Sequence, residues 1–253
     1  MIHHYDFDLF VIGGGSGGVR AARMAGQRGA RVALAECAEL GGTCVNVGCV
    51  PKKLYSYAAG YAAAFEEAPG YGWTLPEAPR FDWATLKRQR AQEITRLNGV
   101  YQKLLDGAGV KTLTGWAQLV DGHTVSVSDT RYTARHILVA TGGMPAAPDM
   151  PGRELAVVSD AMFDLPDFPK RLLVMGGGYI GCEFASLFRG LGAHVTLVNR
   201  GAHILNGFDD DVREALAREM GRQGIDLRMT AQVETLRREG DGLVAMLSRG
   251  QQI

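Results

Sequence analysis

The sequence predicts an α/β protein with two nucleotide-binding βαβ units, because one arrangement of residues occurs in it twice. A short apolar run leads into GGGSGG at positions 13–18, and an Ala-rich segment with helical spacing follows. A second apolar run leads into GGGYIG at positions 176–181 and another helical segment. Glycine supplies 34 of the 253 residues, against roughly 7% in average proteins, and the excess lies in such short runs. Clustered glycines indicate tight turns and close approach of the backbone to a ligand.

The first unit is predicted from three segments of suitable pattern and length. Phe7–Ile12 is a short apolar run typical of a buried strand, Val19–Gln27 has the small-residue spacing of a helix packed on a sheet, and Ala30–Ala35 is a second buried strand. Strand, tight turn, helix and strand in this order make a βαβ unit.

The glycines of this unit form a Rossmann-like fingerprint. Gly13, Gly15 and Gly18 make GxGxxG directly after a strand and at the start of a helix, which lets a pyrophosphate approach the positive helix end. Glu36 follows the second strand, where a carboxylate can accept hydrogen bonds from a ribose hydroxyl. The alternative interpretation is that the glycines serve only the tight turn.

The second unit repeats this order with strand Arg171–Met175, a helix through Phe184–Leu191 and strand Ala193–Val198. Its second strand ends without a carboxylate, and Arg200 follows. An arginine in this place favours the 2′-phosphate of NADPH, and the alternative is a solvated surface arginine. The fingerprint itself consists of Gly176, Gly178 and Gly181.

The residues between the two units predict further regular structure. Leu54–Phe65 and Asp82–Leu105 have helical spacing, and Lys111–Val139 contains alternating, strand-like segments. The Pro-rich stretch Met144–Gly152 is the predicted boundary between two domains.

Composition excludes several classes of partner. Lys plus Arg and Asp plus Glu are both 27, so net charge gives no reason to expect a nucleic-acid or acidic-lipid partner. The apolar runs are far shorter than the ~20 residues of a membrane span. The N-terminus, with exposed histidines expected at His3 and His4, lacks the pattern of a signal peptide. Four cysteines do not make a secreted disulfide framework, so we expect a cytoplasmic protein.

Cys44 and Cys49 are the candidate reactive residues. Four residues separate them in GGTCVNVGCVPKK, and a predicted helix start together with Lys52 and Lys53 would lower a thiol pKa there. This environment suits thiolate chemistry. A zinc pair is the competing interpretation, but no second Cys or Cys/His pair is placed to complete four ligands, and inert buried cysteines are the third. The other two cysteines are expected to be small packed residues, namely Cys37 and Cys182.

With these motifs the sequence resembles the pyridine nucleotide-disulfide oxidoreductases, a family of flavoproteins, from about Phe7 to the end of the chain. GGTCVNVGCVPKK is the most specific match. Three features resemble the members of the family that reduce glutathione disulfide: Arg23 after GGGSGG, the block TRLNGVYQKLL around Tyr101, and VPKK after Cys49. The family's fold is a three-layer ββα type with an FAD-binding and then an NAD(P)-binding domain, which implies 1–148 for the first and 149–253 for the second.

The resemblance implies roles for individual residues. Cys49 corresponds to the thiol beside the flavin and Cys44 to the thiol that exchanges with substrate, so the two would form a redox-active disulfide. Tyr179 resembles the aromatic gate over the nicotinamide side of the flavin, and Glu183 the partner of the flavin-site lysine, Lys52, with Lys53 as the alternative. The remaining matched positions hold FAD (Gly13, Gly15, Ser16, Gly17, Gly18, Glu36, Thr43, Lys52, Ala117, Thr141, Gly142), NADPH (Gly176, Gly178, Ile180, Gly181, Arg200) and glutathione disulfide (Ser16, Arg23, Tyr101).

In the implied reaction, electrons pass from NADPH to FAD, then to the Cys44–Cys49 disulfide and finally to glutathione disulfide. The resemblance also implies a homodimer and no metal. Two departures weaken the case for NADPH over NADH: Asn206 stands where NADPH-dependent members usually have a second arginine, and Gly181 is more typical of NADH-using members. The rival interpretations are a dihydrolipoyl dehydrogenase-like or mercuric reductase-like member, or a non-catalytic flavin-binding protein. The returning FAD segment and the interface domain with its His–Glu pair are expected to lie outside these 253 residues, so the chain alone is expected to be nearly inactive.

Overall fold

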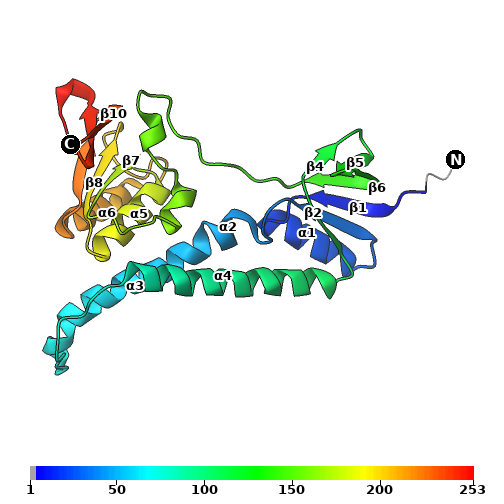
Figure 1. Cartoon of the computed structure of the whole chain (residues 1–253), viewed down its shortest axis with the longest axis horizontal. Helices are drawn as coiled ribbons and strands as arrows, with labels where there is room; N and C mark the ends of the chain where they lie inside the picture. The colour runs from blue at the N-terminus through cyan, green and yellow to red at the C-terminus, as the bar shows by residue number, and fades with distance from the viewer. Residues whose placement is uncertain (1–3) are drawn as a thin grey trace. The chain divides into compact units, whose positions relative to one another are not determined.

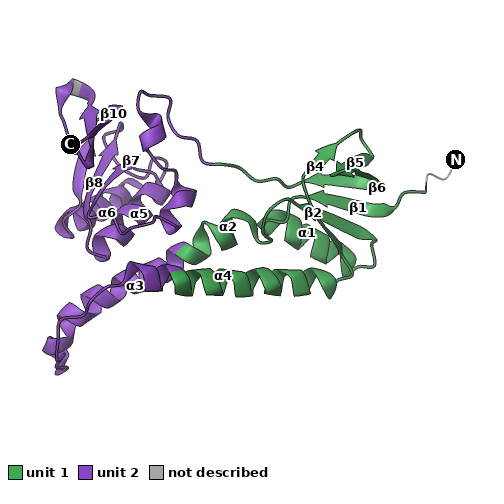
Figure 2. Ribbon diagram, viewed as in Figure 1, with its two compact units in different colours: residues 1–51, 88–144 green, residues 52–87, 145–253 purple. Residues whose placement is uncertain are grey.

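The structure is a computed structural model that describes residues 4–253, apart from the side chain of Arg249. The chain forms two compact units (Figure 2). Unit 1 contains the residues up to 51 together with 88–144, and unit 2 contains 52–87 together with 145–253. His4 is exposed, as expected, and His3 lies outside the described residues.

Unit 1 is built on a six-stranded sheet with strand order β3-β2-β1-β6-β5-β4 (Figure 1). The four strands β3, β2, β1 and β6 run parallel, as βαβ connections require, whereas β4, β5 and β6 are antiparallel neighbours. The strands are β1 (Phe7–Ile12), β2 (Val32–Glu36), β3 (Lys111–Thr114), β4 (Ala117–Leu119), β5 (Thr124–Val127) and β6 (Thr130–Val139).

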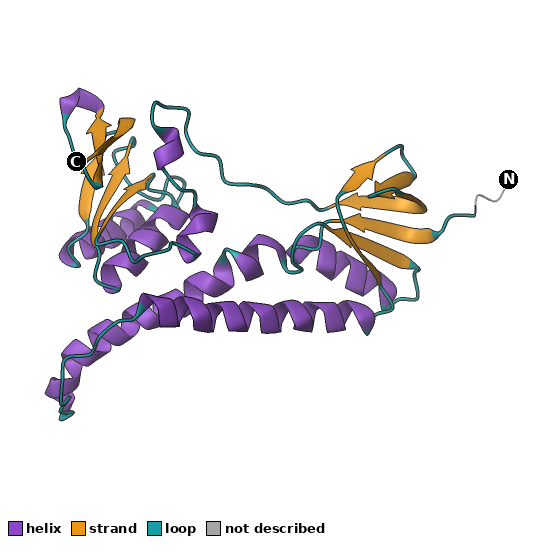
Figure 3. Ribbon diagram, viewed as in Figure 1, coloured by secondary structure: helices purple, strands orange, loops and turns teal. Residues whose placement is uncertain are grey.

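Alternating side chains of β1 and β2 build two cores, one on each face of the parallel sheet. Val11 and Leu34 point to the face covered by helices and pack in one cluster with Val19 and Leu105. Phe10 and its neighbours point to the other face and pack against β5 and β6. Unit 1 therefore has three layers, helices, parallel sheet and antiparallel strands (Figure 3), which confirms the predicted ββα type. The helices that begin in this unit or cross its boundary are α1 (Ser16–Gly26), α2 (Gly42–Asn46), α3 (Cys49–Glu67) and α4 (Trp83–Asp106).

Unit 2 contains a parallel sheet in the order β7-β8-β9 and an antiparallel hairpin, β10-β11. Helix α5 packs its buried residues, among them Phe184 and Phe188, toward the core. The side chain of Asp209 caps α6 by accepting hydrogen bonds from the amides of Asp211 and Val212. The elements are β7 (Arg171–Met175), α5 (Tyr179–Gly190), β8 (His194–Asn199), α6 (Asp210–Arg222), β9 (Asp226–Met229), β10 (Val233–Glu239) and β11 (Gly242–Leu247).

Aromatic residues join the helical part of unit 2, residues 52–87, to its sheet-bearing part. The fully buried Tyr55 donates its hydroxyl hydrogen bond to the carbonyl of Phe163 at 2.9 Å, and the two rings lie 5.5 Å apart. Trp83 donates to the carbonyl of Leu165 at 2.9 Å and contacts the Phe188 ring at 5.9 Å. Short 3₁₀ turns complete the chain at Ala68–Tyr71, Arg153–Leu155, Ser159–Phe163 and Ser248–Gly250.

Both predicted βαβ units are confirmed, and β1 and β7 have the predicted bounds. The helix predicted from Leu54 begins at Cys49 instead, because Pro51 lies in the first turn, where its missing N–H costs no hydrogen bond. The strand predicted from Ala30 begins at Val32. The division into a flavin-binding domain, 1–148, and a nicotinamide-binding domain, 149–253, concerns ligands and stays a prediction. Among the described residues, no helix has the length and apolar character needed to cross a lipid bilayer.

Candidate functional site

The first fingerprint contains two glycines, Gly13 and Gly18, that have no room for a side chain, and one, Gly15, that does. Gly13 has a φ of +106°, and a side chain there would collide with the carbonyl of Ala140. A side chain at Gly18 would collide with the carbonyl of Gly13. A Cβ at Gly15 would meet only Gly42, at an ordinary 3.7 Å. No described residue requires a glycine at position 15, so the open space there suits the close approach of a ligand.

Glu36 is held at this fingerprint by two backbone hydrogen bonds. Its carboxylate accepts from the amide of Gly14 at 2.6 Å and from the amide of Ala38 at 2.9 Å. A cavity of about 270 Å³ adjoins it, with Leu40, Asn98 and further polar residues in its lining. A carboxylate, amides and hydroxyls around a cavity of this size suit the adenosine end of a dinucleotide.

Cys44 and Cys49 form a disulfide, with their Cα atoms 4.7 Å apart. Cys44 lies on α2 and is partly buried, and Cys49 is the first residue of α3 and is exposed. Gly48 closes the loop between them, since a Cβ there would lie 2.7 Å from the carbonyl oxygen of Thr43. The pair therefore lies in the same unit as the first fingerprint.

The other two cysteines differ from each other. Cys182 is buried, as expected, and its thiol contacts the carbonyl of Gly177 at 3.7 Å. Burial, and secondarily the charge of Glu183, raises the pKa of the Cys182 thiol to about 11, which makes it unreactive. Cys37 was expected to be packed, and this was wrong: it is exposed, because it lies just past the end of β2.

The remaining predicted FAD-binding residues all lie in unit 1, apart from Lys52. A Cβ at Gly13 would come within 3.2 Å of the Thr141 Cα, so Thr141 lies beside the fingerprint. Gly42, next to Thr43 at the start of α2, packs against the backbone of Gly15. The other predicted positions lie on α1, at the start of β4 and after β6, namely Ser16, Gly17, Ala117 and Gly142.

The second fingerprint has the same construction as the first. Gly176 has a φ of +104°, a side chain at Gly181 would collide with the Gly176 carbonyl, and a Cβ at Gly178 would meet no atom within 4 Å. Asn199 stands where Glu36 stands in unit 1, because its side-chain oxygen accepts from the amide of Gly177 at 3.2 Å. A neutral amide thus replaces the carboxylate.

The residues after Asn199 add positive charge to this end of the fingerprint. The Asn199 amide donates to the carbonyl of His203 at 2.8 Å, which folds the following loop back. Arg200 is exposed, and among the described residues it has no hydrogen bond or ion pair. Asn206 is also exposed. Arg200 is therefore available to an anionic ligand.

Lys52 and Glu183 form an ion pair inside unit 2. The ammonium group of Lys52 also lies 5.4 Å from the ring centroid of Tyr179, the first residue of α5. Lys53 lies instead 4.8 Å from the ring centroid of Tyr57. Tyr179 is 57% exposed, and Ile180 beside it is 38% exposed. The structure thus brings together three predicted catalytic residues, Lys52, Tyr179 and Glu183, and the side chain of Lys53 does not belong to this group.

The three residues predicted to bind the disulfide substrate lie on two helices of unit 1. Ser16 begins α1, and Arg23 lies in its last turn. Tyr101 of α4 packs against the cluster that also contains Val19 of α1. The structure gives no direct contact among these three side chains in the described part of the chain.

Comparison with known proteins identifies the family. Residues 7–253 match the pyridine nucleotide-disulphide oxidoreductases. The chain belongs to this family. It is 49% identical over 246 residues to a glutathione reductase of Burkholderia cepacia, which covers 97% of this chain and 55% of that protein. It is 43% identical over 244 residues to a glutathione reductase of Nostoc sp., with 96% and 53% covered.

A pea enzyme and one solved structure extend the comparison. The chloroplastic/mitochondrial glutathione reductase of Pisum sativum is 43% identical over 252 residues, with 96% of this chain and 46% of that protein covered. A copper(II) complex of the HOCl-induced flavoprotein disulfide reductase RclA from Escherichia coli superposes with a TM-score of 0.83 at 25% identity, over 97% of this chain and 54% of that chain. This pyridine nucleotide-disulphide oxidoreductase chain spans about half the length of the curated relatives that it matches.

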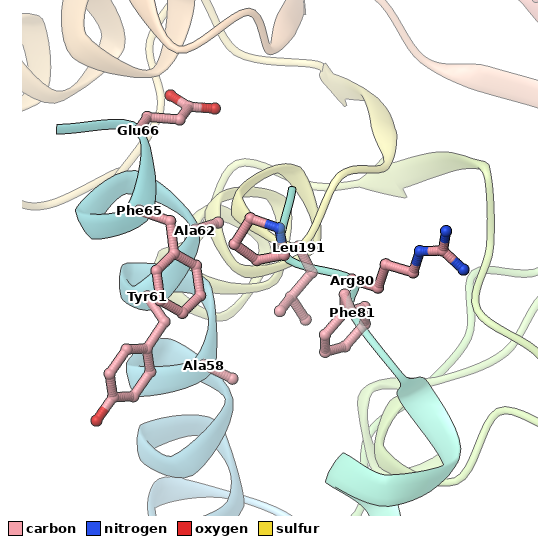
Figure 4. Close-up of a pocket in the computed structure, with 9 residues that line it drawn as sticks. Ala58, Tyr61, Ala62, Phe65, Glu66, Arg80, Phe81 and Leu191 are labelled. Carbon is pink, nitrogen blue, oxygen red and sulfur yellow. The ribbon is translucent and has the colours of Figure 1, made fainter. Parts of the chain in front are cut away.

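A larger cavity is lined by none of the predicted site residues of this oxidoreductase chain. It has a volume of about 490 Å³ and lies in unit 2, along the outer part of α3 and beside Phe81 and Leu191 (Figure 4). Tyr61 and Phe65 form its aromatic wall. Within the described residues, no group of three or more His, Cys, Asp or Glu side chains could hold a metal ion.

The sequence did not single out two asparagines that lie beside the segment carrying Cys44. Asn98 of α4 donates to the side-chain oxygen of Asn46 at 2.9 Å and to the carbonyl of Leu40 at 2.7 Å. Both asparagines lie in sequence segments on which the resemblance to the family was based, CVNVGC and TRLNGVYQKLL. No local pattern pairs positions 52 residues apart, so only the fold could join them.

Proposed function

We propose that the complete protein is a flavin-dependent reductase of glutathione disulfide that takes its electrons from NADPH. One observation carries the proposal: the Cys44–Cys49 disulfide lies in the unit with the first dinucleotide fingerprint, in a chain 43–49% identical to glutathione reductases. Neither a metal site nor a packed core explains a disulfide between two partly accessible cysteines at this place.

FAD fits the first fingerprint. The open space at Gly15 and Gly17 would take the pyrophosphate at the start of α1, and Glu36 would accept hydrogen bonds from the ribose. Thr43, Ala117, Thr141 and Gly142 are proposed to complete the binding site. The bound flavin would supply two-electron transfer between the nicotinamide and the disulfide.

NADPH is the proposed coenzyme because of the charge at the second fingerprint. Asn199 presents no carboxylate that would repel a 2′-phosphate, and Arg200 offers a guanidinium that has no ion-pair partner among the described residues. Asn206 supplies no second positive charge, so the preference over NADH should be modest. Tyr179, exposed at the start of α5, is proposed as the aromatic gate, with the Lys52–Glu183 pair beneath it.

The proposed exchange chemistry uses the two thiols in turn. The Cys44 thiolate attacks one sulfur of glutathione disulfide, forms a mixed disulfide and releases one glutathione thiolate, which takes up a proton. The Cys49 thiolate then attacks the Cys44 sulfur, releases the second glutathione thiolate and restores the Cys44–Cys49 disulfide. Two electrons pass from the protein dithiol to the substrate. Arg23 is proposed to pair with a glutathione carboxylate, and Ser16 and Tyr101 to position the substrate.

The proposal extends to a homodimer in the cytoplasm, a reducing compartment in which a dithiol of this kind stays available for exchange. The test is NADPH-dependent reduction of glutathione disulfide by the complete protein loaded with FAD, with Cys44→Ser as the inactive control. A folded, FAD-loaded protein that oxidises NADPH with other disulfides and leaves glutathione disulfide unreduced would overturn the substrate proposal.

A further inference from the structure

Two asparagine side chains connect α4 to the short helix that carries Cys44. The Asn98 amide donates to the side-chain oxygen of Asn46 at 2.9 Å and to the carbonyl of Leu40 at 2.7 Å. The Asn46 amide donates to the carbonyl of Gly42 at 2.9 Å and lies 3.3 Å from the carbonyl of Leu40. The amides thus link α4 to both ends of the segment from Leu40 to Asn46.

Helix α2 is too short to be stable on its own. It has five residues, and only Val45 of them is buried, whereas isolated helices shorter than about 12 residues are marginal in water. It begins after Gly41, in the left-handed region at a φ of +101°. From Cys44, its middle residue, the disulfide ties it to Cys49 of α3. Reduction cuts this covalent tie, and the amide links to Asn98 remain.

We propose that Asn98 and Asn46 are positioning residues that hold α2, and with it Cys44, in the same place in the disulfide and the dithiol states. The inference rests on the proposed redox activity of the cysteine pair. In the dithiol, the amide links keep the Cys44 sulfur near Cys49 and so favour closure of the disulfide. Without them, α2 gains conformational freedom in the dithiol only, because the disulfide still restrains it in the oxidised state. Loss of either amide should therefore make the pair easier to reduce.

The test measures the disulfide equilibrium of the complete protein against dithiothreitol. Protein disulfide plus dithiothreitol gives protein dithiol plus cyclic oxidised dithiothreitol, with two electrons and two protons transferred. The redox state is read at Cys44 and Cys49 by alkylation and peptide mass spectrometry. Asn98→Ala should raise the equilibrium constant for reduction about tenfold, the factor expected when the backbone freedom of roughly one residue is regained in the dithiol only, which is a shift of about 30 mV to a less negative potential.

Gln102→Ala is the matched control. Gln102 lies on α4 one turn after Asn98 and donates its amide to Asp106 at 2.8 Å and to Thr112 at 3.2 Å, and in the described part of the chain it has no hydrogen bond to α2. Its equilibrium constant should equal that of the unmodified protein. If Asn98→Ala does not fold, Asn46→Ala is expected to shift the equilibrium in the same direction.

An unchanged equilibrium constant in folded Asn98→Ala or Asn46→Ala protein would overturn the inference, and so would an equal shift in Gln102→Ala. This outcome is distinct from failure of the proposed function, which would appear as absent turnover of glutathione disulfide in the unmodified protein. A positive shift in Asn98→Ala without such turnover would support the positioning role and reject the substrate.

Discussion

Arg200→Gln in the complete protein is expected to lower kcat/KM for NADPH by about tenfold to a hundredfold and to leave kcat/KM for NADH unchanged. Arg200 follows β8, is exposed and has no hydrogen bond or ion pair with the described residues, so its removal should not disturb the fold. A 2′-phosphate would meet the Arg200 guanidinium, which no carboxylate of the described residues neutralises. One hydrogen bond between charged groups contributes about 1.5–3 kcal/mol, and about 1.4 kcal/mol corresponds to a factor of ten.

A second variant tests the same reasoning with the opposite charge. Asn199→Glu would place a carboxylate at the position that Glu36 holds in unit 1, where it could accept from the amide of Gly177 as Asn199 does now. This carboxylate would repel a 2′-phosphate and accept hydrogen bonds from a ribose 2′-hydroxyl. We therefore expect the ratio of kcat/KM for NADPH to that for NADH to fall further than in Arg200→Gln.

The assay is steady-state oxidation of each coenzyme at saturating glutathione disulfide, with kcat/KM determined for both. Arg218→Gln is the control, because Arg218 is another exposed arginine, on α6, that pairs with Glu214 of the same helix at 3.5 Å. Its coenzyme ratio should match that of the unmodified protein. Equal losses with NADPH and NADH in Arg200→Gln, or use of NADH as efficient as that of NADPH by the unmodified protein, would refute the reasoning.

Three further predictions each concern one residue. Glu36→Ala removes the acceptor of two backbone amides and should weaken FAD binding at least tenfold, measured as flavin retained after dialysis; full retention would remove Glu36 from the proposed site. Arg23→Ala should raise KM for glutathione disulfide far more than KM for NADPH, and an unchanged KM for the disulfide would contradict the proposed carboxylate contact. Hydrogen bonds from Arg31 hold the pKa of Asp8 at about 2, below its usual 3.8. Because the folded-state pKa is depressed, the stabilisation is complete above about pH 4 and is lost as the pH falls toward 2. In Arg31→Ala the free energy of unfolding, measured with urea, should therefore fall less between pH 5 and pH 2 than in the unmodified protein. An identical pH dependence in the two proteins would show that this pair does not contribute.

The two βαβ units were predictable because each is local in sequence. The run Phe7–Ile12, the fingerprint at Gly13, Gly15 and Gly18 and the carboxylate of Glu36 lie within 30 residues, and strand and helix periods are visible in such a window. The pair of cysteines in GGTCVNVGCVPKK was equally visible. Residue type and short spacing thus determined the fold class and the candidate chemistry.

Only the tertiary structure decided which distant residues meet. Lys52 pairs with Glu183, 131 positions away, and Lys53 on the same helix points instead to Tyr57. The sequence left both lysines as candidates, because two adjacent residues of a helix point in directions about 100° apart and only the packed partner selects one. Asn98 and Asn46 meet because α4 packs beside the α2 segment, a choice made by burial of apolar faces that no local pattern encodes.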